Sequence, residues 1–117
     1  MTDNLTTGER LTILRRRNNL TQADIATKYS VSQMTVSMWE TNAVQFPGIV
    51  NEIQDLHGGE RCYVLRRRLK LRVKETAREL GVSHVTLLKW ERHGPSDDRY
   101  KDYLLNKAVE VDMEAIL

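Results

Sequence analysis

The sequence predicts an all-α fold in which one small helical unit occurs twice in tandem and is followed by a C-terminal helix. The first observation is a gapless internal repeat, because residues 8–43 and 59–94 share 14 identities over 36 positions at an offset of 51. The second is that apolar side chains recur with the period of an α-helix. The third is a low content of helix breakers, with 6 Gly and 2 Pro.

The repeat divides the chain into two small domains, which we place at residues 1–57 and 58–117. Residues 8–10 recur as 59–61, residues 14–17 as 65–68, and Trp39-Glu40 as Trp90-Glu91. His57-Gly58-Gly59 is the predicted linker. Domains of this size lie near the lower limit for independent folding, which favours packing of the two copies or dimerisation.

Capping residues and apolar spacing place the helices of copy one. We expect helices over residues 9–17, after the N-cap Thr21, after the N-cap Ser32, and from Pro47. Thr6 and Glu9 form a capping-box pattern ahead of the first helix. The side chains expected on the apolar faces are Leu11, Leu14, Ile25, Ala26, Tyr29, Val36, Trp39, Ile49, Ile53 and Leu56.

Copy two repeats this plan, with helices expected over residues 60–68, 73–80 and 83–91 and a last helix from Asp97 after the cap Ser96. The turn between its second and third helices contains Gly81 where copy one has Ser30. We expect a left-handed backbone there, which Gly adopts freely and Ser adopts at a cost of roughly 1 kcal/mol. Cys62 replaces Leu11 on the inner face and is expected to be a packed thiol.

Two short helices joined by a tight turn suggest a helix-turn-helix. Copy one resembles the lambda-repressor/Cro-like helix-turn-helix family in the motifs Leu11-x-x-Leu14-Arg15, Leu20-Thr21-Gln22-Ala23-Asp24-Ile25-Ala26, Val31-Ser32-Gln33 and Trp39-Glu40. The resemblance covers residues 9–56 and, less closely, residues 60–108. It implies two tandem DNA-binding domains of this family in one chain.

The resemblance also implies roles for single residues. Arg15 would pair with Glu40, and Arg66 with Glu91, as structural ties between the first and third helices of each copy. Trp39 and Trp90 are expected in the cores. In relatives, the glutamines matching Gln22 and Gln33 lie side by side, one on a phosphate and one on a base edge. Copy two has Val73 and His84 at those positions, so this glutamine pair does not transfer to it.

We expect the DNA contacts on the outward positions of the third helix in each copy and on nearby cations and capping hydroxyls. They are Gln22, Ser32, Gln33, Met34, Ser37 and Met38 in copy one, and Arg67, Arg68, Arg72, Lys74, Ser83, His84, Val85, Thr86 and Lys89 in copy two.

Charge is concentrated in copy two, although the whole chain has a net charge of only +2. Residues 59–94 hold ten basic and four acidic side chains, a net charge of +6. Residues 8–57 hold five of each sign, and residues 95–117 hold three basic and six acidic side chains. Copy two is therefore the expected phosphate-binding surface.

Several function classes are disfavoured by the residue content. We find no nucleophile–base set, Gly-rich phosphate loop or metal-ligand spacing, so we expect neither an enzyme nor a metal or other cofactor. One cysteine excludes an intrachain disulfide framework. No apolar run is long enough to span a membrane, and the polar N-terminus lacks a signal-peptide core, so we expect a cytoplasmic protein.

The C-terminal segment leaves two interpretations open. Its helical stripe comprises Tyr100, Tyr103, Leu104, Ala108, Val111 and Ala115. It either covers its own domain or forms a homodimer contact within residues 100–117, from Tyr100 to Leu117.

The expected partner is double-stranded DNA, and the expected function is transcriptional regulation, as a repressor of phage or mobile-element type. One alternative is a DNA-bending recombination accessory protein. Another is an antitoxin-like or inhibitor-like protein binder that regulates its own gene.

Overall fold

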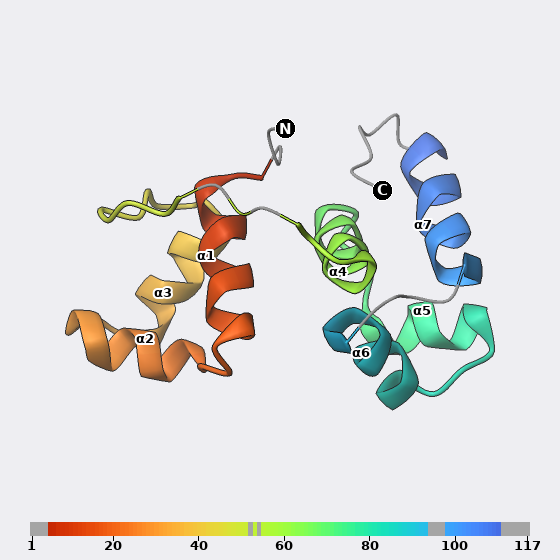
Figure 1. The fold of residues 1–117 in the computed structure, drawn as a ribbon, viewed down its shortest axis with the longest axis horizontal. Coiled ribbons are helices and arrows are strands. Elements are labelled where there is room, and N and C mark those ends of the chain that lie inside the picture. Colours follow the sequence, from red (N-terminus) through yellow and green to blue (C-terminus); the bar gives the residue numbers. More distant parts are fainter. Residues whose placement is uncertain (1–4, 52, 54, 94–97, 111–117) are drawn as a thin grey trace. The chain divides into compact units, whose positions relative to one another are not determined.

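The computed structural model describes residues 5–51, 53, 55–93 and 98–110, and the regular structure within these residues is α-helical. The helices are α1 (Thr7–Arg17), α2 (Gln22–Tyr29), α3 (Gln33–Glu40), α4 (Gly58–Arg68), α5 (Val73–Leu80), α6 (His84–His93) and α7 (Asp98–Glu110) (Figure 1). The predicted all-α fold is confirmed. None of these helices is both long and apolar enough to cross a membrane.

The chain divides into two compact units, residues 1–54 (unit 1) and residues 55–117 (unit 2). The sequence-based boundary lay three residues later, between 57 and 58. The tripeptide predicted as a linker is instead the start of α4. His57 is the N-cap, and its Nδ1 accepts a hydrogen bond from the Glu60 amide at 3.1 Å. Gly58 and Gly59 lie in the first turn of the helix.

In unit 1, α3 packs against both α1 and α2. Its core cluster consists of Leu11, Ile25, Ala26, Val36, Trp39 and Phe46. Two predicted capping boxes begin its helices: Thr6 with Glu9, and Thr21 with Asp24. Hydrogen bonds from the Thr21 backbone and side chain lower the pKa of the exposed Asp24 carboxyl below its usual value.

In unit 2, α6 packs against α4 and α5, and α7 packs against the same two helices. The core cluster consists of Cys62, Leu65, Ala77, Leu87, Tyr100, Leu104 and Ala108. Cys62 is a buried thiol, as predicted. Trp39 is buried in unit 1, whereas Trp90 is partly buried and packs against the unit 2 cluster.

The repeated glycines Gly8 and Gly59 allow a close helix crossing. A Cβ atom on Gly8 would lie 2.5 Å from the Trp39 carbonyl oxygen, and one on Gly59 would lie 2.2 Å from that of Trp90. The first turn of α1 therefore lies almost against the last turn of α3 in unit 1. The first turn of α4 lies in the same way against α6 in unit 2. In unit 1, Asn42 joins this contact, because its Oδ1 accepts from the Gly8 amide at 3.0 Å.

The predicted fourth helix of copy one is wrong, because the described residues between Thr41 and His57 contain no helix. Phe46 is buried against Trp39, but Ile49, expected on an apolar face, is 93% exposed. The cause is local: Gly48, two β-branched residues and Asn51 follow Pro47, and all four disfavour a helix. Without that helix as cover, Leu14 and Tyr29 are also exposed rather than buried.

The C-terminal stripe belongs to its own unit, as one of the two interpretations held. Tyr100, Leu104 and Ala108 are buried in the core of unit 2. These three side chains are not available to a second chain, so the expected homodimer contact is not supported. The cap Ser96, Asp97, and the stripe residues Val111 and Ala115 lie outside the described residues.

The turn between α2 and α3 has the predicted left-handed residue. Ser30 has φ 56° and ψ 44°, and Gly81 has φ 72° and ψ 29° at the same place in unit 2. After each of them, a valine amide bonds back into the helix, Val31 to Ala26 and Val82 to Ala77, both at 3.0 Å.

We predict that Ser30→Gly stabilises the protein by roughly 1 kcal/mol, because glycine adopts this backbone without the steric cost of a Cβ atom. Urea unfolding of the full chain measures the change. The matched control is Ser37→Gly inside α3, which should destabilise by a similar amount. A loss of stability for Ser30→Gly would mean that the left-handed turn is assigned wrongly.

Candidate nucleic-acid interface

Each unit contains a bidentate ion pair that ties its first helix to its third. Arg15 Nε donates to Glu40 Oε2 at 2.6 Å, and Arg15 Nη2 donates to Oε1 at 3.1 Å. Arg66 and Glu91 repeat this geometry at 2.6 and 3.1 Å. Both carboxylate side chains are 0% exposed, so each must be paired to be tolerated.

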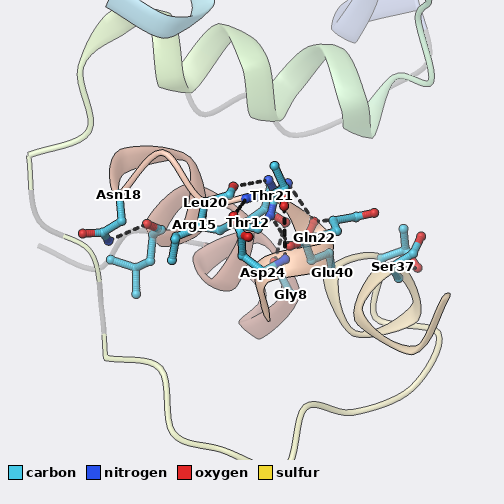
Figure 2. A network of polar contacts seen from close by, with 12 residues as sticks. Gly8, Thr12, Arg15, Asn18, Leu20, Thr21, Gln22, Asp24, Ser37 and Glu40 are labelled. Atoms are coloured by element: carbon cyan, nitrogen blue, oxygen red, sulfur yellow. Dashed lines mark hydrogen bonds and ion pairs between the residues drawn. The ribbon is translucent and has the colours of Figure 1, made fainter. Parts of the chain in front are cut away.

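The same arginines also hold the loop before the second helix. Arg15 Nη1 donates to the Leu20 carbonyl at 3.0 Å, and Arg66 Nη1 donates to the Leu71 carbonyl at 2.9 Å. One guanidinium therefore fixes three elements: its own helix, the loop that leads into the next, and the end of the third. Figure 2 shows this arrangement in unit 1, where Arg15 lies between Leu20 and Glu40.

The third hydrogen-bond donor to the buried carboxylate differs between the units. In unit 1, Gln22 Nε2 donates to Glu40 Oε1 at 3.0 Å (Figure 2). In unit 2, where Val73 replaces that glutamine, the Tyr100 hydroxyl donates to Glu91 Oε2. Burial, followed by the Glu91 charge, raises the pKa of Tyr100. Burial alone would lower the pKa of Arg66, but its bond to Glu91 and the Glu91 charge raise it.

The outward positions of α3 and α6 differ in chemistry. On α3, Gln33 and Met34 are exposed, while Ser37 and Met38 are partly buried. On α6, His84, Val85 and Lys89 are exposed, and Thr86 is partly buried. The inward positions Val36 and Leu87 are both 0% exposed, so each helix has one face in a core and one toward solvent.

The predicted capping serines are engaged in helix capping. Ser32 Oγ accepts from the Thr35 amide, and Ser83 Oγ accepts from the Thr86 amide, both at 3.1 Å. Each serine hydroxyl also lies 3.0 Å from the threonine hydroxyl. Their backbone amides and hydroxyls thus lie at the N-termini of α3 and α6, the ends that attract phosphate.

The predicted cations of unit 2 lie at two helix ends. Arg67 is exposed near the end of α4, and its Nη1 donates to the Tyr63 hydroxyl at 2.6 Å. Arg68 follows it and is partly buried. Arg72 is the N-cap of α5, and Lys74 lies in that helix's first turn, both exposed.

Two residues with structural roles have no signal in the repeat pattern. The repeat has no counterpart for Tyr100, because the 36-residue match ends at residue 94, so the pattern gave no signal for its bond to Glu91. Asn42 is replaced by His93 in copy two, so the repeat gave no signal for its bonds either. Its Nδ2 donates to Thr6 Oγ1 at 2.8 Å while its Oδ1 holds Gly8, which links the end of α3 to the start of α1.

Among the described residues, no group of three or more His, Cys, Asp or Glu side chains could hold a metal ion. Comparison of the chain with protein-family models, curated protein sequences and solved structures found no match.

We predict that Glu91→Ala destabilises the protein by about 3 kcal/mol, because Arg66 loses its partner in a buried site. Glu40→Ala should also destabilise, but less, since Arg15 is more exposed than Arg66. Urea unfolding monitored by circular dichroism gives both values. Asp102→Ala, an exposed carboxylate on α7, is the control and should change stability by about 0.5 kcal/mol or less. Unchanged stability in both glutamate variants would refute the role of the pairs.

Proposed function

We propose that the chain is a sequence-specific double-stranded DNA-binding transcriptional regulator in which α3 and α6 enter the major groove. The observation that carries the proposal is the repeated short helix pair joined by a left-handed turn, with one face of the second helix in the core and one toward solvent. A helix presented this way matches the geometry by which helix-turn-helix proteins contact base edges.

The side chains on these faces suit base recognition. The Gln33 amide can both donate and accept, which matches the edge of adenine, whereas Lys89 and His84 suit guanine or phosphate. Met34, which is 72% exposed, and Val85 are apolar groups that can contact thymine methyls. Because the two faces differ, we propose a DNA site with unlike halves.

Gln22 takes a second role in this proposal, in addition to the one expected from its sequence. One N–H of its side-chain amide donates to Glu40 and braces the buried carboxylate. The second N–H of the same amide remains able to donate to a phosphate. We therefore assign the adenine contact in unit 1 to Gln33, and we assign bracing of Glu40 together with a phosphate contact to Gln22.

The positive charge of unit 2 supports the proposal that this unit supplies most of the sequence-independent affinity for DNA. Residues 59–94 carry a net charge of +6, and Arg67, Arg72 and Lys74 are exposed there. The resemblance of copy one to phage-type repressors favours repression at a phage or mobile-element operator as the regulatory task.

We predict that affinity for a random-sequence duplex falls steeply with salt. With about six phosphates neutralised, the slope of log K against log salt would be near −5. The double variant Arg72→Gln/Lys74→Gln should make this slope shallower by about 2, one for each lost phosphate contact. Fluorescence anisotropy at several salt concentrations measures both slopes.

The matched control is Lys101→Gln, an exposed cation on α7 within the acidic C-terminal segment, which should leave the slope unchanged. A wild-type slope shallower than about −2 would contradict the proposal that the basic surface of unit 2 contacts phosphates. So would a Lys101→Gln effect equal to that of the double variant.

A further inference from the structure

Residues of α1, the end of α2 and the segment after α3 line a largely apolar pocket of about 510 Å³ in unit 1. Its lining includes Leu11 and Leu14 of α1, Tyr29 at the end of α2, and Phe46, Ile49 and Val50 of the following segment. Leu14 and Tyr29 are 36% and 42% exposed, and Ile49 is almost fully exposed. Large apolar side chains gathered around one exposed hollow are typical of a binding surface.

In unit 2, the surface equivalent to this pocket is covered by α7. The positions equivalent to Leu11, Leu14 and Tyr29 are Cys62, Leu65 and Leu80. There α7 packs on α4 and α5, and Leu65 is 0% exposed. The α7 side chains in that core are Tyr100, Leu104 and Ala108, which are spaced four residues apart and so line one face of the helix.

Unit 1 fills this surface only in part, with the buried Phe46 and Ile53 and the partly buried Val50. Its Phe46 ring lies 5.0 Å from the Trp39 ring, as the Tyr100 ring lies 6.1 Å from that of Trp90. No helix follows Phe46 in the described residues up to His57. The pocket therefore lies where unit 2 has α7, and the segment after α3 fills it only in part.

The rim of this site has the opposite charge in unit 1. In unit 2, the Tyr103 hydroxyl of α7 donates to Glu79, and burial followed by this bond raises the pKa of Tyr103 to about 12. The residue of unit 1 that corresponds to Glu79 is Lys28, which is exposed. Lys28 lies beside the pocket, because its Nζ is 5.8 Å from the centre of the Tyr29 ring, and Tyr29 is part of the lining. A helix seated here would meet this cation where α7 meets a carboxylate.

We propose that this pocket binds an amphipathic helix of a second protein, with apolar side chains at positions i, i+4 and i+8 and a carboxylate opposite Lys28. This inference goes beyond the proposed DNA binding and does not depend on it. The residues of α7 that would fill the pocket from another copy are buried in their own unit, so a second chain would have to open unit 2 to supply them.

The test uses the full chain and a fluorescent peptide with the sequence of residues 98–110, stapled between its outward positions 102 and 106. The staple makes the peptide helical before binding, so a failure cannot be ascribed to its folding cost. One peptide keeps the tyrosine of position 103, and the other has Tyr103→Glu. We expect saturable binding of both, with the glutamate peptide tighter.

Three variants of the chain locate the binding. Lys28→Glu should weaken the glutamate peptide about fivefold and remove its advantage over the tyrosine peptide. Ile49→Asn, at a residue that contributes little to the fold, and Leu14→Asn should each weaken both peptides, Leu14→Asn by about tenfold or more. The matched control Val44→Asn, an exposed apolar residue outside the pocket, should bind both peptides like the wild type.

Amide chemical-shift changes on peptide addition should centre on residues 11–17, 29 and 46–50. Absence of saturable binding up to about 1 mM would overturn the proposal, as would equal binding by the Lys28→Glu, Ile49→Asn and control variants. Shift changes centred on α4 and α5 would show exchange with α7 instead. A concentration-dependent dimer that involves the pocket amides would show that a second copy fills it. Either result would refute the proposed partner.

Discussion

The buried carboxylate that ends the third helix of each unit is the constraint on which the rest of the structure depends. Glu40 and Glu91 have fully buried side chains, and a buried charge is tolerated only when it is paired and hydrogen-bonded. The arginine of the first helix satisfies this need with two bonds and uses a third to hold the loop before the second helix. The orientation of α3 and α6, and hence the side chains they present to solvent, follows from this pairing. Gly8 and Gly59 permit it, because a Cβ atom at either position would collide with the backbone at the end of the third helix.

In both units the arginine–glutamate pair and the three helices it joins form the same frame, but the third hydrogen bond to the buried carboxylate comes from a different element. This difference accounts for the different surfaces beside the first helix of each unit. In unit 1 the last bond to the carboxylate comes from Gln22, which lies on the adjacent helix, so no element from outside the three-helix frame is required. In unit 2 it comes from Tyr100 on α7, which also closes the core with Leu104 and Ala108. The described residues of unit 1 contain no fourth helix, and a largely apolar pocket lies beside α1. The arginine–glutamate frame is shared, while the surface beside the first helix differs between the units.

Most helix starts and the left-handed turns could be predicted from the sequence, because the repeat and the capping residues are local signals. The caps Thr6, Thr21 and Ser32 begin helices as expected, and Ser30 has the left-handed backbone that its alignment with Gly81 indicated. The segment after Asn42 could not be predicted well, because the repeat ends there and a short apolar pattern does not distinguish a helix from a chain that buries only Phe46. The bonds of Gln22 and Tyr100 to the carboxylates were not predictable either, since each depends on how elements meet in space and exists in one copy only.

Hydroxyl-radical footprinting on a duplex selected from random sequences tests whether both α3 and α6 contact DNA, as we propose. We expect protection of two unlike segments, over roughly two helical turns if one chain binds. Gln33→Ala should weaken protection of one segment and Lys89→Ala that of the other, with Gln45→Ala in the exposed segment after α3 as a control without effect. Protection of one segment only, unaffected by one of the two variants, would show that one unit does not contact DNA and would contradict the claim.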